Sequence, residues 1–284
     1  MDRFQDGHHV RLRSRVQRTY LHAADDGESV TLSQRRASMN AAWAVHIYDG
    51  GDGDGEGDGD GDGDPDGDGP YLLLHNAAYG RYLAATARPA RPGHHGLRTE
   101  LRDYDQPEVE AIKWRAVRSG FADDIVLLRH VGGRYLRANG KYLPWNSTGV
   151  TVDDKASSMM YWIVETIPLR EAGIPAIPAP LPNRPIFSGI FSSRGRRIRF
   201  VLAAEDGSYP EEVDGWRQFW LRGRSAFSLR GNLAAHIDVA DPNIAMCVRA
   251  GRHGRLTPLV VNLPDGGYGG TLEIVVFLAG TPGE

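Results

Sequence analysis

Cysteine is almost absent from this chain of 284 residues, and the single Cys247 has no partner for a disulfide within the chain. It lies in the apolar run 244–248, which is typical of a strand, so a buried and unreactive thiol is expected. A chain that does not depend on disulfides suits a reducing compartment. We therefore expect a cytoplasmic location, with the nucleus left open.

Long apolar runs are missing too. No stretch reaches the roughly 18–20 apolar residues that are needed to cross a bilayer, and the first residues, Met1 to Gly7, show no apolar leader. The sequence predicts no membrane association.

Patterns that carry catalysis or hold metals are also lacking. The pairs His8–His9 and His94–His95 are adjacent, so on a strand their side chains point apart and do not converge on a metal. The glycine-rich stretch 266–270 lies between two expected strands and opens no helix, which argues against a phosphate cradle. No nucleophile elbow is present. We predict a protein that is not an enzyme and that uses no metal and no cofactor.

Charge is unevenly distributed along the chain. Residues 49–69 hold ten acidic groups and no basic one, so removing them from a net charge of −3 leaves about +7 on the rest. That excess is small for a nucleic-acid binder, and we expect no nucleic-acid partner. The acidic insert alternates Gly and Asp without apolar residues, which predicts a disordered loop. Its likeness to a calcium loop starting at Asp58 fails at the twelfth position, Gly69, where glutamate is needed.

A short motif recurs along the first part of the chain. Gly80–Leu83 and Gly133–Leu136 both read Gly-Arg-Tyr-Leu, and Arg18–Leu21 is a looser copy. Each copy belongs to a unit of four short expected strands, and each unit ends in a strand that begins near a tryptophan. The expected strands lie at 9–16, 19–23, 29–32 and 43–48; at 72–76, 80–84, 97–101 and 112–117; and at 125–129, 133–136, 149–152 and 161–164. Three matching units of four strands predict a β-trefoil over residues 1–167, with the acidic insert at 49–69 between the first two units.

The repeated residues have expected structural roles. The glycine suits a turn with positive φ, and the tyrosine and leucine point to opposite faces of their strand. The tryptophans are expected to fill the core; they are Trp43, Trp114 and Trp162. An arginine near each tyrosine is the part of the motif that stays available for function; these are Arg18, Arg81 and Arg134.

A proline-rich segment at 168–185 predicts a linker, because its spacing suits neither a helix nor a central strand. Beyond it, residues 186–284 predict a β-grasp, ubiquitin-like domain of α+β type. Its expected elements are strands at 197–202 and 219–221, a helix at 226–237 with Ser225 as N-cap, and strands at 246–249, 259–263 and 272–277.

Two groups of arginines are the candidate binding residues. Arg11, Arg13 and Arg15 alternate on a strand and therefore share one face. A second group in the ubiquitin-like domain contains Arg196, Arg197 and Arg199, beside Arg194. Because arginine is favoured at protein interfaces, both groups predict docking to an acidic protein surface.

Several segments of the chain resemble a known plant family. They are 4–14, 41–45, 78–84, 102–107, 129–140 and 249–260. The chain resembles plant proteins with a domain of unknown function that combine a fascin-like, actin-cross-linking β-trefoil with an associated ubiquitin-like domain. The resemblance implies actin as the suspected partner and supplies no catalytic residue to transfer. Bundling of filaments would require self-association or a further site in the second domain, because only one trefoil is present.

The expected function is that of a non-enzymatic protein-interaction or scaffold protein, with protein partners and no predicted oligomeric state. The alternative is a carbohydrate-binding trefoil. Ricin-type repeats carry glutamine two residues before the tryptophan, and this chain has Ala41, Ile112 and Met160 there. That lectin class is disfavoured, while other modes of glycan binding stay open.

Overall fold

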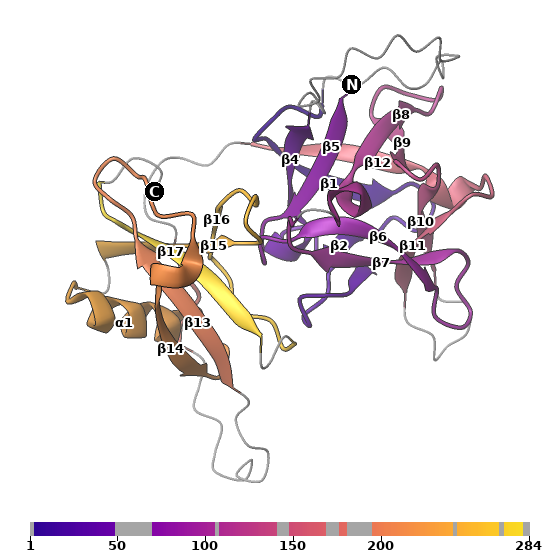
Figure 1. Cartoon of the computed structure of the whole chain (residues 1–284). Coiled ribbons are helices and arrows are strands. Elements are labelled where there is room, and N and C mark those ends of the chain that lie inside the picture. Colours follow the sequence, from indigo (N-terminus) through magenta and orange to yellow (C-terminus); the bar gives the residue numbers. More distant parts are fainter. Residues whose placement is uncertain are drawn as a thin grey trace.

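The computed structural model describes residues 3–48, 70–105, 108–140, 148–168, 176–180, 195–240, 243–266 and 270–280. The acidic insert and most of the proline-rich segment, on which two sequence predictions rest, lie outside these residues. The described parts form a β-trefoil followed by a smaller domain with one helix and a mixed sheet (Figure 1).

All twelve predicted strands of the trefoil are present, with shifted ends. Six of them pair in a closed ring and form the barrel; they are β1 (His9–Ser14), β4 (Trp43–Tyr48), β5 (Tyr71–Asn76), β8 (Trp114–Arg118), β9 (Ile125–His130) and β12 (Trp162–Ile167). The other six form three hairpins that cap it; they are β2 (Tyr20–Ala23) with β3 (Val30–Ser33), β6 (Tyr82–Pro89) with β7 (Leu97–Arg102), and β10 (Tyr135–Asn139) with β11 (Gly149–Asp153). Closure leaves the barrel without a free edge.

The repeated tryptophan and leucine are joined in every unit. Each indole Nε1 donates to the carbonyl oxygen of the repeated leucine, at 3.1, 2.8 and 3.0 Å. The pairs are Trp43 with Leu21, Trp114 with Leu83, and Trp162 with Leu136, and all six side chains are fully buried in one core. A buried indole needs an acceptor, so this bond ties the last strand of each unit to its motif.

The repeated turn before each tyrosine uses a positive φ. Gly80 and Gly133 have φ of 66° and 82°, and in the first unit the same position is Arg18, with φ of 54°. Arg18 is therefore the counterpart of the glycines, and Thr19 is the counterpart of Arg81 and Arg134. The arginine near the tyrosine therefore occupies the turn position itself in the first unit and follows that position in the other two.

The smaller domain has a five-stranded sheet in the order β14-β13-β17-β15-β16, in which β13 and β17 run parallel. Its strands are β13 (Gly195–Leu202), β14 (Arg217–Arg222), β15 (Ile244–Arg249), β16 (Thr257–Pro258) and β17 (Thr271–Leu278). Helix α1 (Ala226–Ile237) begins at the predicted N-cap, where the hydroxyl of Ser225 accepts from the N–H of Ser228 at 3.2 Å. The helix packs on one face of the sheet through Leu229 and Leu233.

The predicted strand at 259–263 is absent. Of the residues 257–263, only Thr257–Pro258 pair with β15. The N–H of Leu259 still bonds Met246, but that of Leu263 bonds Arg224, so the chain leaves the sheet. The segment is apolar because the side chains of Leu259 and Leu263 are buried in the core of the domain, although they belong to a loop.

Candidate functional site

The second unit of the trefoil provides one contact surface between the two domains. The hydroxyl of Tyr82 accepts from the N–H of Arg255 at 3.2 Å, and the Thr257 hydroxyl lies 3.0 Å from Nδ1 of His75. The N–H of Tyr104 donates to Ala250 at 2.8 Å. We call this contact the seam, and Figure 1 shows β15 and β16 on the side of their domain that faces the trefoil.

A cluster of aromatic rings lies beneath the seam. The rings of His46 and His75 are 4.8 Å apart, and Nδ1 of His46 lies 3.1 Å from the hydroxyl of Tyr82. Burial, with His46 close by, lowers the pKa of His75 to about 3. Burial and the nearby Arg255 lower the pKa of His46 to about 4. Both rings are neutral at neutral pH and bonded to hydroxyl groups, so the cluster serves packing. A general base would need a pKa near the working pH.

The thiol of Cys247 is equally unsuited to chemistry. It is buried in β15, and burial raises its pKa to about 12. A thiol that stays protonated is a poor nucleophile. This agrees with the expectation of an inert buried residue.

Arg196 departs from its predicted place on a binding face. Its side chain is buried, with the residue 4% exposed, and Nη2 donates to the carbonyl oxygens of Pro264 and Gly266 at 2.7 and 2.9 Å. On β13 it shares the core side with Ile198, because alternate residues of a strand share a face. The loop that it braces contacts the trefoil: the N–H of Asp265 donates to Asp25 at 2.6 Å.

The three units present equivalent outer faces around the barrel. In each, the repeated tyrosine pairs with the second-to-last residue of the preceding barrel strand. The pairs are Arg13 with Tyr20, His75 with Tyr82, and Arg129 with Tyr135. In two faces the tyrosine hydroxyl also contacts the residue three positions after a tryptophan. That residue is His46 for Tyr82 and Glu165 for Tyr20. The seam thus covers one face of a set of three.

The corresponding face of the first unit carries a trefoil arginine cluster, which consists of Arg11, Arg13 and Arg36 around Glu165. Glu165 lies 3.1 Å from Nε of Arg13 and 2.8 Å from Nε of Arg36, and it also accepts from the Tyr20 hydroxyl at 3.2 Å. Arg11 lies opposite Glu165 on the paired strand, and its buried Nε has no hydrogen-bond partner among the described residues. Burial and the nearby Arg36 lower the pKa of Arg11.

The structure brings two of the three predicted trefoil arginines into this cluster. Arg15 follows the end of β1, and its guanidinium lies 4.6 Å from the centre of the Phe121 ring. Arg36 and Glu165 were not among the binding residues predicted from the sequence. The pairing of β1 with β12, a contact between the two ends of the trefoil, brings Glu165 to the site.

The second predicted group forms an exposed hairpin of β13 and β14, which we call the arginine–tryptophan hairpin. Arg197 pairs across strands with Trp220, which is 60% exposed, and its Cζ lies 5.8 Å from the centre of that ring. Within the described part of the chain, Arg197, Arg199 and Arg222 have no carboxylate within ion-pair distance. Arg194 lies outside the described residues.

A cavity of about 640 Å³ opens at the end of the barrel where β8 turns into β9. Phe121, which is 60% exposed, lies at its wall with Arg3, Arg118 and Asp123. The cavity was not predictable from the sequence, because its walls come from the start of the chain, the turn between β8 and β9, and β12.

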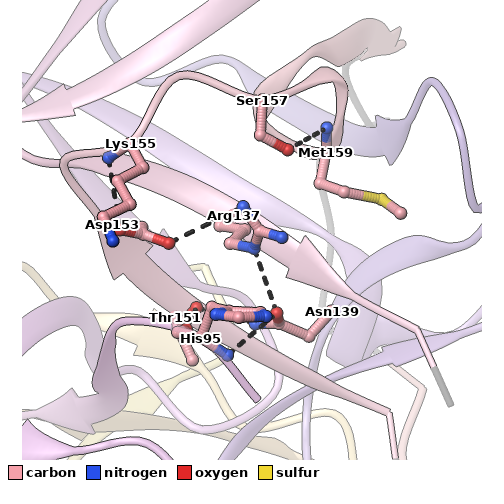
Figure 2. A network of polar contacts seen from close by, with 8 residues as sticks. All are labelled: His95, Arg137, Asn139, Thr151, Asp153, Lys155, Ser157 and Met159. Carbon is pink, nitrogen blue, oxygen red and sulfur yellow. Dashed lines mark hydrogen bonds and ion pairs between the residues drawn. The ribbon is translucent and has the colours of Figure 1, made fainter. Parts of the chain in front are cut away.

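A polar network in the third unit is shown in Figure 2. Nε of Arg137 donates to Asn139 at 3.1 Å, Nδ2 of Asn139 donates to the Thr151 hydroxyl at 2.7 Å, and that hydroxyl donates to the carbonyl oxygen of His95 at 2.7 Å. Arg137 also lies 3.6 Å from Asp153. These polar groups bind one another, so the network fastens the β10–β11 hairpin to the second unit.

Among the residues that the structure describes, no three His, Cys, Asp or Glu side chains gather as metal ligands would. Helix α1, at 12 residues, is too short to span a bilayer, and no other described helix is long and apolar enough to do so.

Comparison with known proteins gives family matches over both domains. A model described as "Beta-trefoil domain of unknown function (DUF569)" matches residues 1–52 and 68–165, and one described as "DUF569 associated ubiquitin-like domain" matches 194–277. No curated protein matches the chain.

Two solved structures of low identity are similar to part of this chain. The SDF2-like protein from Arabidopsis thaliana is 18% identical, with a TM-score of 0.44, over 58% of this chain and 98% of that one. A ricin B-like lectin from Macrolepiota procera, solved with lactose, is 14% identical, with a TM-score of 0.42, over 57% of this chain and 96% of that one. The family matches carry the assignment, and the chain belongs to the family of β-trefoil domains of unknown function (DUF569), with that family's associated ubiquitin-like domain as its second domain.

Proposed function

We propose that this protein is a non-enzymatic interaction protein whose trefoil docks an acidic protein surface at the trefoil arginine cluster. The observation that carries the proposal is the imbalance of charge there. Three guanidinium groups surround the single carboxylate of Glu165, and the buried Nε of Arg11 has no hydrogen-bond partner among the described residues. A buried donor without an acceptor costs about 1–3 kcal/mol. A carboxylate from a partner would remove that cost.

The position of the cluster supports a protein partner. It occupies the face of the first unit that corresponds to the seam in the second, where the chain's own ubiquitin-like domain is packed. Arginine also binds carboxylates in a fixed, forked geometry that suits interfaces. A partner would therefore use the trefoil in the way that the second domain already does.

Actin is the partner to test first, because of the fold resemblance drawn from the sequence. Filament co-sedimentation at physiological salt is the experiment. The wild-type chain should pellet with filaments, and the variant R11Q/R36Q should bind about tenfold more weakly, which corresponds to about 1.4 kcal/mol.

The control is R134Q, which removes one positive charge, against two in R11Q/R36Q. Arg134 is exposed in the turn before β10, away from Glu165, so this variant should pellet like the wild type. Wild-type protein left in the supernatant would exclude actin as the partner. Equal pelleting of R11Q/R36Q and R134Q would exclude the cluster as its site.

A second candidate function, carbohydrate binding, is favoured by the cavity at the barrel end. Exposed Phe121 offers an aromatic platform there, with Asp123 and Arg118 as hydrogen-bonding groups. Such a mixture of an aromatic side chain and a few polar groups is typical of small-ligand sites. A glycan array with the wild type and with F121A tests this function. Signals that the variant loses would support it, and a blank array at high protein concentration would reject it.

A further inference from the structure

Strand β14 is an open edge of the ubiquitin-like sheet. It stands at the end of the strand order, so β13 is its only partner in the sheet of described residues. Figure 1 shows it on the outer border of its domain, away from the trefoil. Alternate backbone N–H and C=O groups of such a strand point outward without a ladder partner.

The register of the hairpin is fixed by its inner face. Ile198, Phe200 and Leu221 are buried in the core of the domain. Because side chains alternate along a strand, the other face must carry Arg197, Arg199 and Trp220. The exposed indole is therefore a consequence of the register and does not reflect a loose strand.

The outer face of this hairpin carries positive charge. Glu273 lies opposite Arg199 on β17, but its carboxylate pairs with Nη2 of Arg249 at 2.8 Å. The loop that carries Trp216 covers the neighbouring part of this sheet face, over Cys247 and Val275, and leaves the hairpin end open. An exposed tryptophan among arginines is the composition of binding hot spots.

Charge and backbone together select the class of partner. A second copy paired through β14 would oppose arginines with arginines, which is destabilising. Single-stranded nucleic acid could use the indole and the guanidinium groups, but it would leave the strand edge unpaired. An extended acidic peptide satisfies the backbone groups, the charges and the indole at once.

We propose that β14 is a docking edge for an extended acidic segment of a partner protein, which adds to the sheet as a further strand. An apolar side chain of that segment packs on Trp220, and its carboxylates pair with Arg222 and Arg197. This site is separate from the trefoil arginine cluster and does not depend on the function proposed for that cluster. With both sites, one chain would join two acidic partners.

The test uses the full chain and a labelled, end-capped peptide that alternates glutamate with valine, with fluorescence anisotropy as the readout. The peptide should bind, and binding should weaken at least about tenfold in W220A and in R197E/R199E. The control matched in charge is R88E/R134E, which reverses two exposed arginines of the trefoil that lie outside both proposed sites and should bind like the wild type. Trp220 is 60% exposed, so W220A should keep its fold, and circular dichroism checks this.

Two further probes separate strand addition from other modes. The same peptide with alternate backbone nitrogens methylated on the pairing edge should lose binding, and the amides of residues 217–222 should gain protection from hydrogen exchange with the unmethylated peptide. Undiminished binding of the methylated peptide would overturn strand addition. Tighter binding of a thymidine oligonucleotide with the same net charge would make the hairpin a nucleic-acid site. No binding of the glutamate–valine peptide would overturn the proposal.

Discussion

Arg18 holds a backbone conformation that glycine holds in the other two units. Its φ of 54° lies in the left-handed region, where a side chain costs roughly 1–2 kcal/mol. The turn closes as in the second unit: the N–H of Arg18 donates to Ser14 at 2.9 Å, and that of Gly80 donates to Asn76 at 2.8 Å. The fold therefore imposes the strained conformation on Arg18.

The variant R18G should stabilise the protein by about 0.5–1 kcal/mol, because relief of strain exceeds the entropy lost by glycine on folding. Denaturant unfolding measures this. The reciprocal variant G133A should destabilise by about 1 kcal/mol, since a Cβ there meets nothing within 4 Å and only the φ of 82° opposes it. A less stable R18G would contradict this account of the turn.

Trp114 combines buried bulk with a buried hydrogen bond. Its Nε1 donates to Leu83 at 2.8 Å. W114F should lower the free energy of unfolding by about 2–3 kcal/mol, from the lost bond and the smaller ring. Urea unfolding is the measurement. A loss below about 0.5 kcal/mol would mean that the bond does not fasten the unit.

Arg196 was predicted to bind a partner together with Arg197 and Arg199, but its side chain is buried. On a strand, Arg196 points to the same face as Ile198 and to the other face from Arg197. The alternation of side chains was therefore enough to exclude Arg196 from the binding residues. Its partners, Pro264 and Gly266, come from a loop far along the chain and were not predictable.

At the scale of elements, the β10–β11 hairpin depends on the network in Figure 2. Asn139 is buried and links Arg137 to Thr151. N139A should cost about 2 kcal/mol, because it leaves two buried polar groups unsatisfied. Thermal unfolding with K155A as control checks this, since Lys155 joins the network only through its backbone N–H. Equal losses in the two variants would contradict the role of the network.

The false strand at 259–263 illustrates the limit of apolar patterns. Leu259 and Leu263, four residues apart, would share one face of a strand, but they can equally fill the core from a loop. Pro258 has no N–H to extend a ladder. The helix at 226–237 was predictable because its period and its N-cap, Ser225, agree.

At the scale of the whole molecule, the seam makes stability sensitive to pH. His46 and His75 have pKa values lowered to about 4 and about 3, against 6.5 in an unfolded chain. The unfolded state therefore takes up protons first as the pH falls. Stability is complete above about pH 6.5 and declines below it, by about 2 kcal/mol for each ring at pH 5.

Denaturant unfolding at pH 7 and at pH 5 measures the decline. In H75Q the difference between the two pH values should be smaller by about 2 kcal/mol than in the wild type, whatever its starting stability. Other histidines with lowered pKa values, such as His130, act equally in both proteins. An unchanged difference would mean that His75 is not shielded at the seam.

The sequence by itself determined the trefoil, because three copies of a turn, a tyrosine, a leucine and a later tryptophan impose one local geometry three times. It also determined the helix and most strands of the second domain, since the spacing of apolar residues within each element predicts its type. Tertiary structure alone decided which of three similar faces is covered, because the contacts of Arg255 with Tyr82 and of Thr257 with His75 join segments far apart in the chain. It decided as well that Glu165 joins the arginines of β1, while Trp220 stays exposed at a free edge. Contacts between segments far apart in the chain determine which side chains are buried and which charges are paired. The side chains left exposed or unbalanced in charge are the ones that can bind a partner.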